Sequence, residues 1–218
     1  MKKALLFDCD GVVATTFPFH FAAWCAVMPP EIEIAEGVVK RNEGAPAFRI
    51  AQEIYRANHL GLDEAQARLF AEAKNRYFRQ HHSASIYPEI EPLLDIAEAM
   101  SCRHGLVTGT VLENLRSFMP EELLQRFHCL VKDKDVEQGK PHPQPYLTAA
   151  NRLQIPAADC LVVENAPLGI QSALAAQMTC VALTTTLPAE ELTGAHFIFA
   201  DHGELLARLP DLLAGAAI

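Results

Sequence analysis

The 218-residue sequence lacks the features of a nucleic-acid-binding or membrane protein. It has no block of Lys and Arg, and 27 acidic residues against 18 basic ones give a formal net charge of −9. Binding to nucleic acid or to an anionic membrane surface is therefore not expected. No apolar run approaches the length needed to span a bilayer. Anionic small molecules remain possible ligands, because the field of a binding site is local.

The sequence also lacks paired cysteines and a recognisable targeting segment. Its cysteines are scattered without a Cys-x-x-Cys pair, which is typical of a reduced, cytoplasmic protein. They are Cys9, Cys25, Cys102, Cys129, Cys160 and Cys180. Lys2 and Lys3 precede a short apolar run, but Asp8 and Asp10 interrupt it too early for a signal peptide, so we expect no targeting segment. A half-hydrophobic chain without repeats is expected to bury a core of its own.

Short apolar runs separated by helical stretches indicate the fold class. Continuous apolarity, rather than alternation, is typical of parallel strands covered on both faces. The runs are ALLFD at 4–8, GLVT at 105–108, CLVK at 129–132, CLVVE at 160–164, CVALTT at 180–185 and FIFAD at 197–201. The sequence therefore predicts an α/β fold with a doubly wound, Rossmann-like parallel sheet.

The segment from Thr15 to Tyr87 contains no strand-like run and predicts consecutive helices. Helical spacing is present at 45–58 and at 63–81, and Asp63 is a candidate N-cap of the second helix. The apolar stripe of that helix is expected to comprise Leu69, Phe70, Ala73, Tyr77 and Phe78. The expected domains are a core of residues 1–14 and 88–218 and an inserted helical cap domain of residues 15–87.

Two acidic residues close the first apolar run. Asp8 and Asp10 are two positions apart, so in an extended chain both carboxylates project to one side and Cys9 to the other. Gly11 lets the chain turn away without a side chain crowding them. The pair can address one reacting group, although Asp-x-Asp-Gly is also common as turn chemistry after a strand.

Hydroxyl residues close the second run. Ligands of open α/β sheets bind outside the carboxyl ends of the strands, where Thr108 and Gly109 lie. Thr110 and Glu113 fit a capping box for a helix from about residue 111, and a helix N-terminus binds anions. Thr108 would add a hydroxyl donor to an anion site there. The alternative is that both threonines only cap the helix.

A lysine and a pair of oxygen ligands follow later strands. Lys140 lies in a loop that three prolines stiffen, whereas the default for a single lysine is a solvated surface position. Glu164 and Asn165 end the run at 160–164, and their side-chain oxygens are of the kind that Mg2+ requires. Asn165 could instead build a turn with Pro167.

In chain order, these residues resemble the four motifs of the haloacid dehalogenase superfamily: Asp8-x-Asp10-Gly11, Thr108, Gly139-Lys140-Pro141 and Val163-Glu164-Asn165. The resemblance covers nearly the whole chain, and the helical insert lies where the superfamily's first type of cap domain lies. The chain looks most like the β-phosphoglucomutase-like branch, which contains many sugar-phosphate phosphatases. FHFAAW at 19–24 resembles the start of the cap in that branch, and TTTLPAEEL at 184–192 resembles its later sequence.

The resemblance implies a Mg2+-dependent phosphatase that hydrolyses a small phosphorylated metabolite, with a sugar phosphate expected, through an aspartyl-phosphate intermediate. Asp8 would be the nucleophile, and Asp10 would donate and then accept a proton. Thr108 and Lys140 would hold the transferring phosphoryl oxygens, with Gly109 beside them. The expected ligands of Mg2+ are Asp8, the backbone carbonyl of Asp10, Glu164 and Asn165.

One position departs from the superfamily's pattern. The fourth motif commonly has two acids, and here the second is Asn165. An amide oxygen can still coordinate Mg2+, but the site loses one negative charge. The sequence therefore predicts weaker metal binding than a site with two acids, and Asn165→Asp is expected to lower the apparent Mg2+ requirement.

The helical segment is expected to close over the site and to contact the part of the substrate that is not phosphate. His20 is the residue that the resemblance selects for substrate binding, and Trp24 is interpreted as packing. Most of the remaining basic residues are expected to form solvated helix faces. They are Lys40, Arg41, Arg49, Lys74 and Arg76.

A sugar phosphate mutase shares every core residue named so far. His20 favours the mutase, whereas the segment RNEGAPAFR at 41–49, in which the mutase's substrate-loop pattern cannot be placed, favours a phosphatase. Dehalogenation would leave Asp10 without a task. A phospho-accepting signalling module lacks the helical insert, and a non-catalytic binding member is motivated only by Asn165. We expect a monomer or a weak homo-oligomer.

Overall fold

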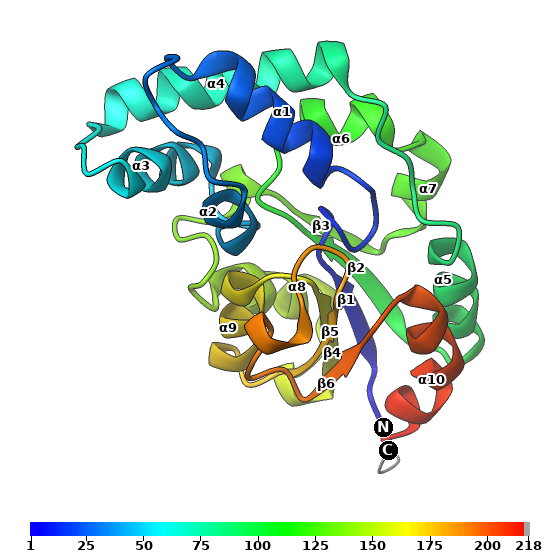
Figure 1. Cartoon of the computed structure of the whole chain (residues 1–218). Helices are drawn as coiled ribbons and strands as arrows, with labels where there is room; N and C mark the ends of the chain where they lie inside the picture. Colours follow the sequence, from blue (N-terminus) through cyan, green and yellow to red (C-terminus); the bar gives the residue numbers. More distant parts are fainter. Residues whose placement is uncertain (216–218) are drawn as a thin grey trace.

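The computed structural model describes residues 1–215 and contains a six-stranded, wholly parallel sheet (Figure 1). The strands are β1 (Ala4–Phe7), β2 (Arg103–Val107), β3 (Cys129–Val131), β4 (Cys160–Glu164), β5 (Thr179–Leu183) and β6 (Phe197–Phe199). They lie in the order β3-β2-β1-β4-β5-β6. Each predicted run forms a strand, and the order is that of a doubly wound sheet, as predicted.

Helices cover both faces of the sheet. One face carries α5 (Ile90–Ala99), α6 (Leu112–Phe118), α7 (Glu121–Arg126) and α10 (His202–Ala214), and the other carries α8 (Gln144–Leu153) and α9 (Pro167–Ala175). Short 3-10 helices occur at Asp133–Asp135, Ala157–Asp159 and Ala189–Glu191. This coverage explains why the strands are continuously apolar in sequence.

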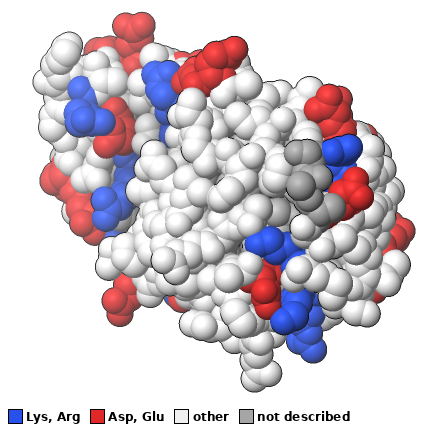
Figure 2. Space-filling view, turned by 90° about the horizontal axis from the view of Figure 1, so that it is seen from below, with Lys and Arg blue, Asp and Glu red and all other residues white. Residues whose placement is uncertain are grey.

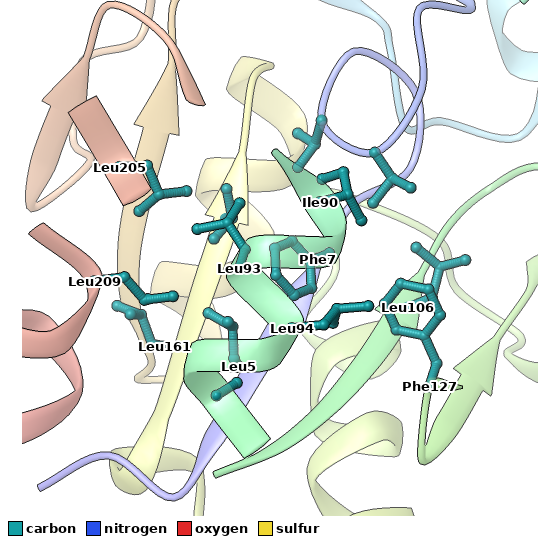
Figure 3. Close-up of a cluster of buried hydrophobic side chains, with 14 of the residues drawn as sticks. Leu5, Phe7, Ile90, Leu93, Leu94, Leu106, Phe127, Leu161, Leu205 and Leu209 are labelled. Atoms are coloured by element: carbon teal, nitrogen blue, oxygen red, sulfur yellow. The ribbon is translucent and has the colours of Figure 1, made fainter. Parts of the chain in front are cut away.

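Side chains of the central strand β1 alternate between two apolar clusters, one on each face of the sheet. Leu5 and Phe7 enter the cluster below α5 and α10, and the intervening Leu6 enters the cluster below α8 and α9. Figure 3 shows the first cluster, in which Leu5 and Phe7 lie beside Leu93 and Leu94 of α5, and Leu209 of α10 lies beside Leu161. Cys9 is fully buried in the same cluster, as predicted.

Of the helices between β1 and β2, the first four gather on one side of the molecule (Figure 1). They are α1 (Phe17–Val27), α2 (Glu36–Arg41), α3 (Ala47–Ala57) and α4 (Glu64–His81). We call residues 17–81 the helical insert. It has an apolar cluster of its own, which includes Trp24, Ile50 and Ile54.

Helix α4 begins as predicted, but the residues on its buried side differ from the predicted ones. Asp63 caps it by accepting a hydrogen bond from the backbone N–H of Gln66 at 2.9 Å. The predicted apolar stripe is wrong for Leu69, which is 65% exposed, whereas Ala67 and Ala71 are buried. These alanines let α1 and α3 approach α4 closely, so close packing outweighs the size of the leucine.

The molecular surface carries charges of both signs. On the face drawn in Figure 2, acidic and basic side chains are interspersed, without a large patch of either sign. Within residues 1–215, no helix combines the length and the apolarity that crossing a membrane requires.

Candidate active site

The site forms where the strand order reverses around β1. Because β2 and β4 both pair with β1 in parallel, their carboxyl ends meet at one edge of the sheet. Asp8 follows β1, Thr108 follows β2, and Glu164 is the last residue of β4. All three side chains are buried, and Lys140 Nζ contacts Asp8, Glu164 and the carbonyl of Val107 next to Thr108, so the structure brings these predicted residues together.

Lys140 lies at the centre of a buried polar network. Its Nζ lies 2.5 Å from Asp8 Oδ1 and 2.6 Å from Glu164 Oε1, and it donates to the Val107 carbonyl at 3.2 Å. The Tyr146 hydroxyl donates to the same Glu164 oxygen at 2.6 Å. Burial works to lower the pKa of Lys140, but the Asp8 and Glu164 carboxylates raise it above its ordinary value. Lys140 is therefore a permanent cation rather than a solvated surface lysine.

Acidic groups outnumber cations around Asp8. Burial raises the pKa of the Asp8 carboxyl to about 8; Lys140 opposes the rise, and Glu164 and Asp10 add to it by repulsion. One lysine therefore has to balance several carboxylates in a region closed to water. A further cation would be electrostatically favourable here.

Asp10 belongs to a second, separate network. Its Oδ1 accepts hydrogen bonds from Thr16 Oγ1 at 2.6 Å and pairs with His20 Nε2 at 3.1 Å, while Oδ2 accepts from Thr110 Oγ1 at 2.7 Å. Burial alone would raise the pKa of Asp10, but His20 and the two threonine hydroxyls bring it below its ordinary value. His20 thus lies against Asp10, with its ring stacked on Phe78.

The predicted capping box at Thr110 is wrong. Helix α6 begins at Leu112 with Val111 as its N-cap, and no side chain caps it. The Thr110 hydroxyl instead donates to Asp10, because a hydrogen bond to a buried carboxylate is charge-assisted and therefore strong. Thr108 Oγ1 accepts from the backbone N–H of Thr110 at 3.0 Å, so both threonines belong to the site.

A loop of the helical insert lies directly on the core residues of the site. A Cβ atom on Gly109 would lie 2.8 Å from the Gly44 carbonyl oxygen, and one on Gly44 would lie 3.0 Å from the Lys140 side chain. Gly44 also has a φ of +83°, a conformation that side chains disfavour. Only glycines permit this approach, which closes the site from the side of the insert.

Glu43, in the same loop, reaches the residue that departs from the superfamily's pattern. Asn165 Nδ2 donates to Glu43 Oε2 at 3.2 Å and to Thr186 Oγ1 at 2.8 Å. Both Glu43 and Asn165 are buried, at 6% and 0% exposure. Within residues 1–215, Glu43 Oε1 and Asn165 Oδ1 have no hydrogen-bond partner. Burial raises the pKa of Glu43 well above its ordinary value, and Asp10 and Asp8 add to the rise.

The donor set is compatible with a divalent cation only in part. Among residues 1–215, no three His, Cys, Asp or Glu side chains converge closely enough to hold a metal by themselves. Both oxygens of Glu164 are already engaged, Oε1 by Lys140 and Tyr146 and Oε2 by the backbone N–H of Asn165. Asn165 Oδ1, buried and without a partner in that range, is an oxygen that a hard cation would satisfy.

A cavity of about 270 Å³ separates the helical insert from the core, and Asp10 and Gly109 lie in its wall. Most of the apolar lining comes from the insert, including Phe17, Trp24 and Phe48. Lys74 also lines the cavity; it is buried, which corrects its prediction as a solvated residue. Burial lowers the pKa of Lys74 to about 8, with Asp10 and Glu43 opposing.

Sequence reasoning missed several of the side chains that build this site, among them Thr16 and Thr186, whose hydroxyls contact Asp10 and Asn165. Glu43 carried a signal, since it lies in the segment at 41–49 that fits no pattern, but that segment was not connected with Asn165. Tyr146 reads as an ordinary core position of a helix. The Thr110 hydroxyl was assigned to a helix terminus.

An open parallel α/β sheet with buried acids, a threonine and a lysine at its carboxyl edge defines a hydrolase of the phosphoryl-transfer kind. A family model described as haloacid dehalogenase-like hydrolase matches residues 2–177. The chain belongs to this family, and the predicted family is confirmed.

Relatives and solved structures agree with this assignment. Fructose-1-phosphate phosphatase YqaB of Escherichia coli (strain K12) is 32% identical over 81% of this chain and 94% of its own length. Beta-phosphoglucomutase of Bacillus subtilis (strain 168) is 26% identical over 95% of this chain and 93% of its own. A solved structure from Bacteroides vulgatus has a TM-score of 0.87 at 26% identity and covers 100% of this chain and 91% of its own. The fold class and the enzyme class, a phosphatase of this family, are confirmed.

Proposed function

We propose that this chain is a Mg2+-dependent phosphatase that hydrolyses a small phosphorylated metabolite, of which a sugar phosphate is the class we favour. The observation that carries the proposal is the contrast between two neighbouring acids. Asp8 lies against the Lys140 ammonium, whereas Asp10 is held by two hydroxyls and an imidazole. Two carboxylates in different environments are suited to nucleophilic and proton-transfer roles.

In the first half-reaction, a carboxylate oxygen of Asp8 attacks the phosphorus atom and the bond to the substrate oxygen breaks. The leaving oxygen takes a proton from Asp10, whose protonated form is favoured when the phosphate brings negative charge beside it. Lys140 and the Thr108 hydroxyl hold the transferring oxygens, and Gly109 leaves room beside them.

In the second half-reaction, water attacks the phosphorus atom of the aspartyl-phosphate and gives a proton to Asp10. The bond to the Asp8 oxygen breaks, which restores the carboxylate and releases inorganic phosphate. His20 and Thr16 keep Asp10 in place for both transfers. The same carboxyl group thus serves as acid and then as base.

We assign the metal to Asp8, the backbone carbonyl of Asp10 and the pair Glu164 and Asn165. Mg2+ would supply positive charge to the phosphoryl oxygens. The buried Asn165 Oδ1, without a partner within residues 1–215, supports this assignment. Because Lys140 already occupies Glu164 Oε1, we expect Asp8 and Asn165 to be the more important ligands.

We further propose that residues 15–87 form a cap domain that opens to admit the substrate. The insert loop at 42–46 lies against Gly109 and Lys140, and Asp8 is only 2% exposed. The phosphate therefore needs a movement of the insert, whose two connections meet where Thr15 and Ser85 are hydrogen-bonded. His20 and Lys74 would contact the part of the substrate that is not phosphate.

The charge of the cavity favours hydrolysis over the mutase reaction, which must hold a second phosphate group. Its lining contains four acids and three basic residues, so it does not attract a second dianion. The acids are Asp10, Glu43, Glu72 and Asp133, and the basic residues are Arg68, Lys74 and Lys134. The phosphatase among the relatives acts on fructose 1-phosphate by its name, and this supports a sugar phosphate.

A panel of sugar phosphates and other phosphorylated metabolites, assayed for phosphate release with Mg2+, tests the proposal. We expect one or a few sugar phosphates to be hydrolysed, and Asp8→Asn to reduce the rate by more than about 1,000-fold, because the nucleophile is lost. Interconversion of sugar 1- and 6-phosphates with little phosphate release would instead establish the mutase. Undiminished activity of Asp8→Asn would refute the mechanism.

A further inference from the structure

Glu43 is a buried carboxylate for which the described protein provides incomplete compensation. It comes from the helical insert and crosses to the core, where Oε2 accepts one hydrogen bond from Asn165. Within residues 1–215, Glu43 forms no ion pair within 4 Å, and Oε1 has no hydrogen bond. A buried carboxylate in this state is costly unless a cation or further donors complete it.

Asn165 presents a second oxygen of the same kind. Its amide N–H groups are taken by Glu43 and Thr186, which fixes the orientation of the amide. Its Oδ1 is fully buried and has no donor in the described part of the chain. Two buried acceptor oxygens without partners in residues 1–215 thus lie on hydrogen-bonded neighbours, and a hard divalent cation prefers oxygens of this kind.

We propose that Glu43 supplies the second carboxylate of the Mg2+ site, which restores from the helical insert the charge that Asn165 lacks. The inference deepens the proposed function, since it concerns the same cation. It revises the expectation of weak binding that Asn165 alone would give. It also couples two events: Glu43 reaches the site only while the insert lies on the core, so cation binding and closure of the insert favour each other.

Glu43→Gln is the informative substitution. Glutamine is nearly isosteric and can keep its carbonyl oxygen on Asn165 Nδ2, so only the ability to supply a negative charge to a cation is lost. Mg2+ affinity, measured by titration calorimetry without substrate, is expected to fall about 10- to 100-fold. Glu72→Gln is the matched control, because Glu72 also lines the cavity from the insert but forms no hydrogen bond with Asn165; the Mg2+ affinity of this variant is expected to match wild type.

Thermal unfolding supplies a readout that is independent of activity. Without Mg2+, Glu43→Gln is expected to melt at or above the wild-type temperature, because a buried carboxyl group without full compensation is replaced by a neutral amide. With saturating Mg2+, its gain in melting temperature is expected to be smaller than that of wild type. A purely structural Glu43 would give the opposite result, with lower stability without Mg2+ and an unchanged gain.

Moving the acid back to the core completes the test. In Asn165→Asp/Glu43→Gln, the Mg2+ dissociation constant is expected to return to within about threefold of wild type, because the number of charged ligands is restored. Closure can be followed by fluorescence of Trp24, the single tryptophan, which lies in α1 of the insert. Its response to Mg2+ is expected to be lost in Glu43→Gln and not regained in the double variant.

The outcomes separate this inference from the proposed function. Unchanged Mg2+ affinity in Glu43→Gln, together with phosphatase activity of the wild type, overturns the role of Glu43 and leaves the phosphatase intact. Mg2+ binding that depends on Glu43 in a protein that releases no phosphate from the panel supports the inference and overturns the phosphatase. No measurable binding of Mg2+ by wild type overturns both.

Discussion

Two lysines of the site region are buried, one in the core and one in the helical insert. Lys140 has its ammonium on Asp8 and Glu164, and these carboxylates raise its pKa. Lys74 lies over the rings of Trp24 and Phe78, without a hydrogen bond or ion pair within residues 1–215, and burial lowers its pKa to about 8.

The difference in pairing between Lys140 and Lys74 indicates different roles for the core and the helical insert. In the core, the Lys140 ammonium finds its carboxylate partners, Asp8 and Glu164, within the core itself, as a reaction shared by a whole family requires. The insert buries groups that stay incompletely paired, namely Lys74 and Glu43. Such groups lower the stability of the protein without ligand, and a ligand can supply their missing partners. We therefore expect the insert to determine substrate specificity.

The largest effect is expected when the core lysine is removed. Lys140→Met leaves Asp8 and Glu164 buried without their counter-ion, so the free energy of unfolding should fall by about 3–5 kcal/mol. Phosphatase activity should be lost as well. Urea unfolding measures the first effect. Lys132→Met, which removes a more exposed lysine paired with Asp135, is the control and should cost about 0–1 kcal/mol.

If Lys140→Met does not fold, the double variant Asp8→Asn/Lys140→Met can be measured in its place. Removing one of the two stranded carboxylates should restore part of the lost stability, because fewer like charges remain buried. Equal stability of Lys140→Met and Lys132→Met would show that the core network does not stabilise the protein.

The insert lysine should behave in the opposite way. Lys74→Met is expected to raise the free energy of unfolding at pH 7 by about 1–4 kcal/mol, because a buried ion is replaced by an apolar chain of similar length. For a sugar phosphate substrate, KM should increase more than kcat decreases. A loss of stability would mean that Lys74 is paired after all and that the contrast with Lys140 is wrong.

The pH dependence of that gain follows from the pKa of Lys74. The folded protein releases the proton near pH 8, and the unfolded chain only near the ordinary value of 10.5. Between these values the unfolded chain binds more protons, so wild-type stability rises with pH relative to Lys74→Met. The advantage of the variant should therefore be full below pH 8 and shrink toward pH 10.5, as measured by denaturant unfolding across this range.

The contrast between core and insert also explains what sequence could predict. Asp8, Thr108 and Glu164 end apolar runs, and parallel strands bring their ends together, so local pattern was enough to group them. Glu43 reaches Asn165 only because a loop with Gly44 lies on Gly109, a contact between segments that are far apart in sequence.

The sequence also did not predict correctly which side of helix α4 is buried. The stripe that included Leu69 followed residue size, whereas close packing of alanines decided which side of α4 is buried. Lys74 was predicted to be exposed because a lysine in a helix usually is. The roles of the individual site residues, including those of Gly109 and His20, stay predictions until variants are assayed.

The smallest effect concerns Tyr146, which supports the core network without touching Asp8. Tyr146→Phe removes the hydroxyl that donates to Glu164 Oε1 and keeps the ring below Lys140. Because Lys140 still satisfies that oxygen, the free energy of unfolding should fall by only about 1–2 kcal/mol. Tyr55→Phe, whose hydroxyl makes no hydrogen bond within residues 1–215, should change stability by less than about 0.5 kcal/mol. Equal effects of the two substitutions in urea unfolding would show that Lys140 alone holds Glu164. Lys140 would then be the main partner of Glu164 in the core, just as a ligand would be the main partner of the unpaired groups in the insert.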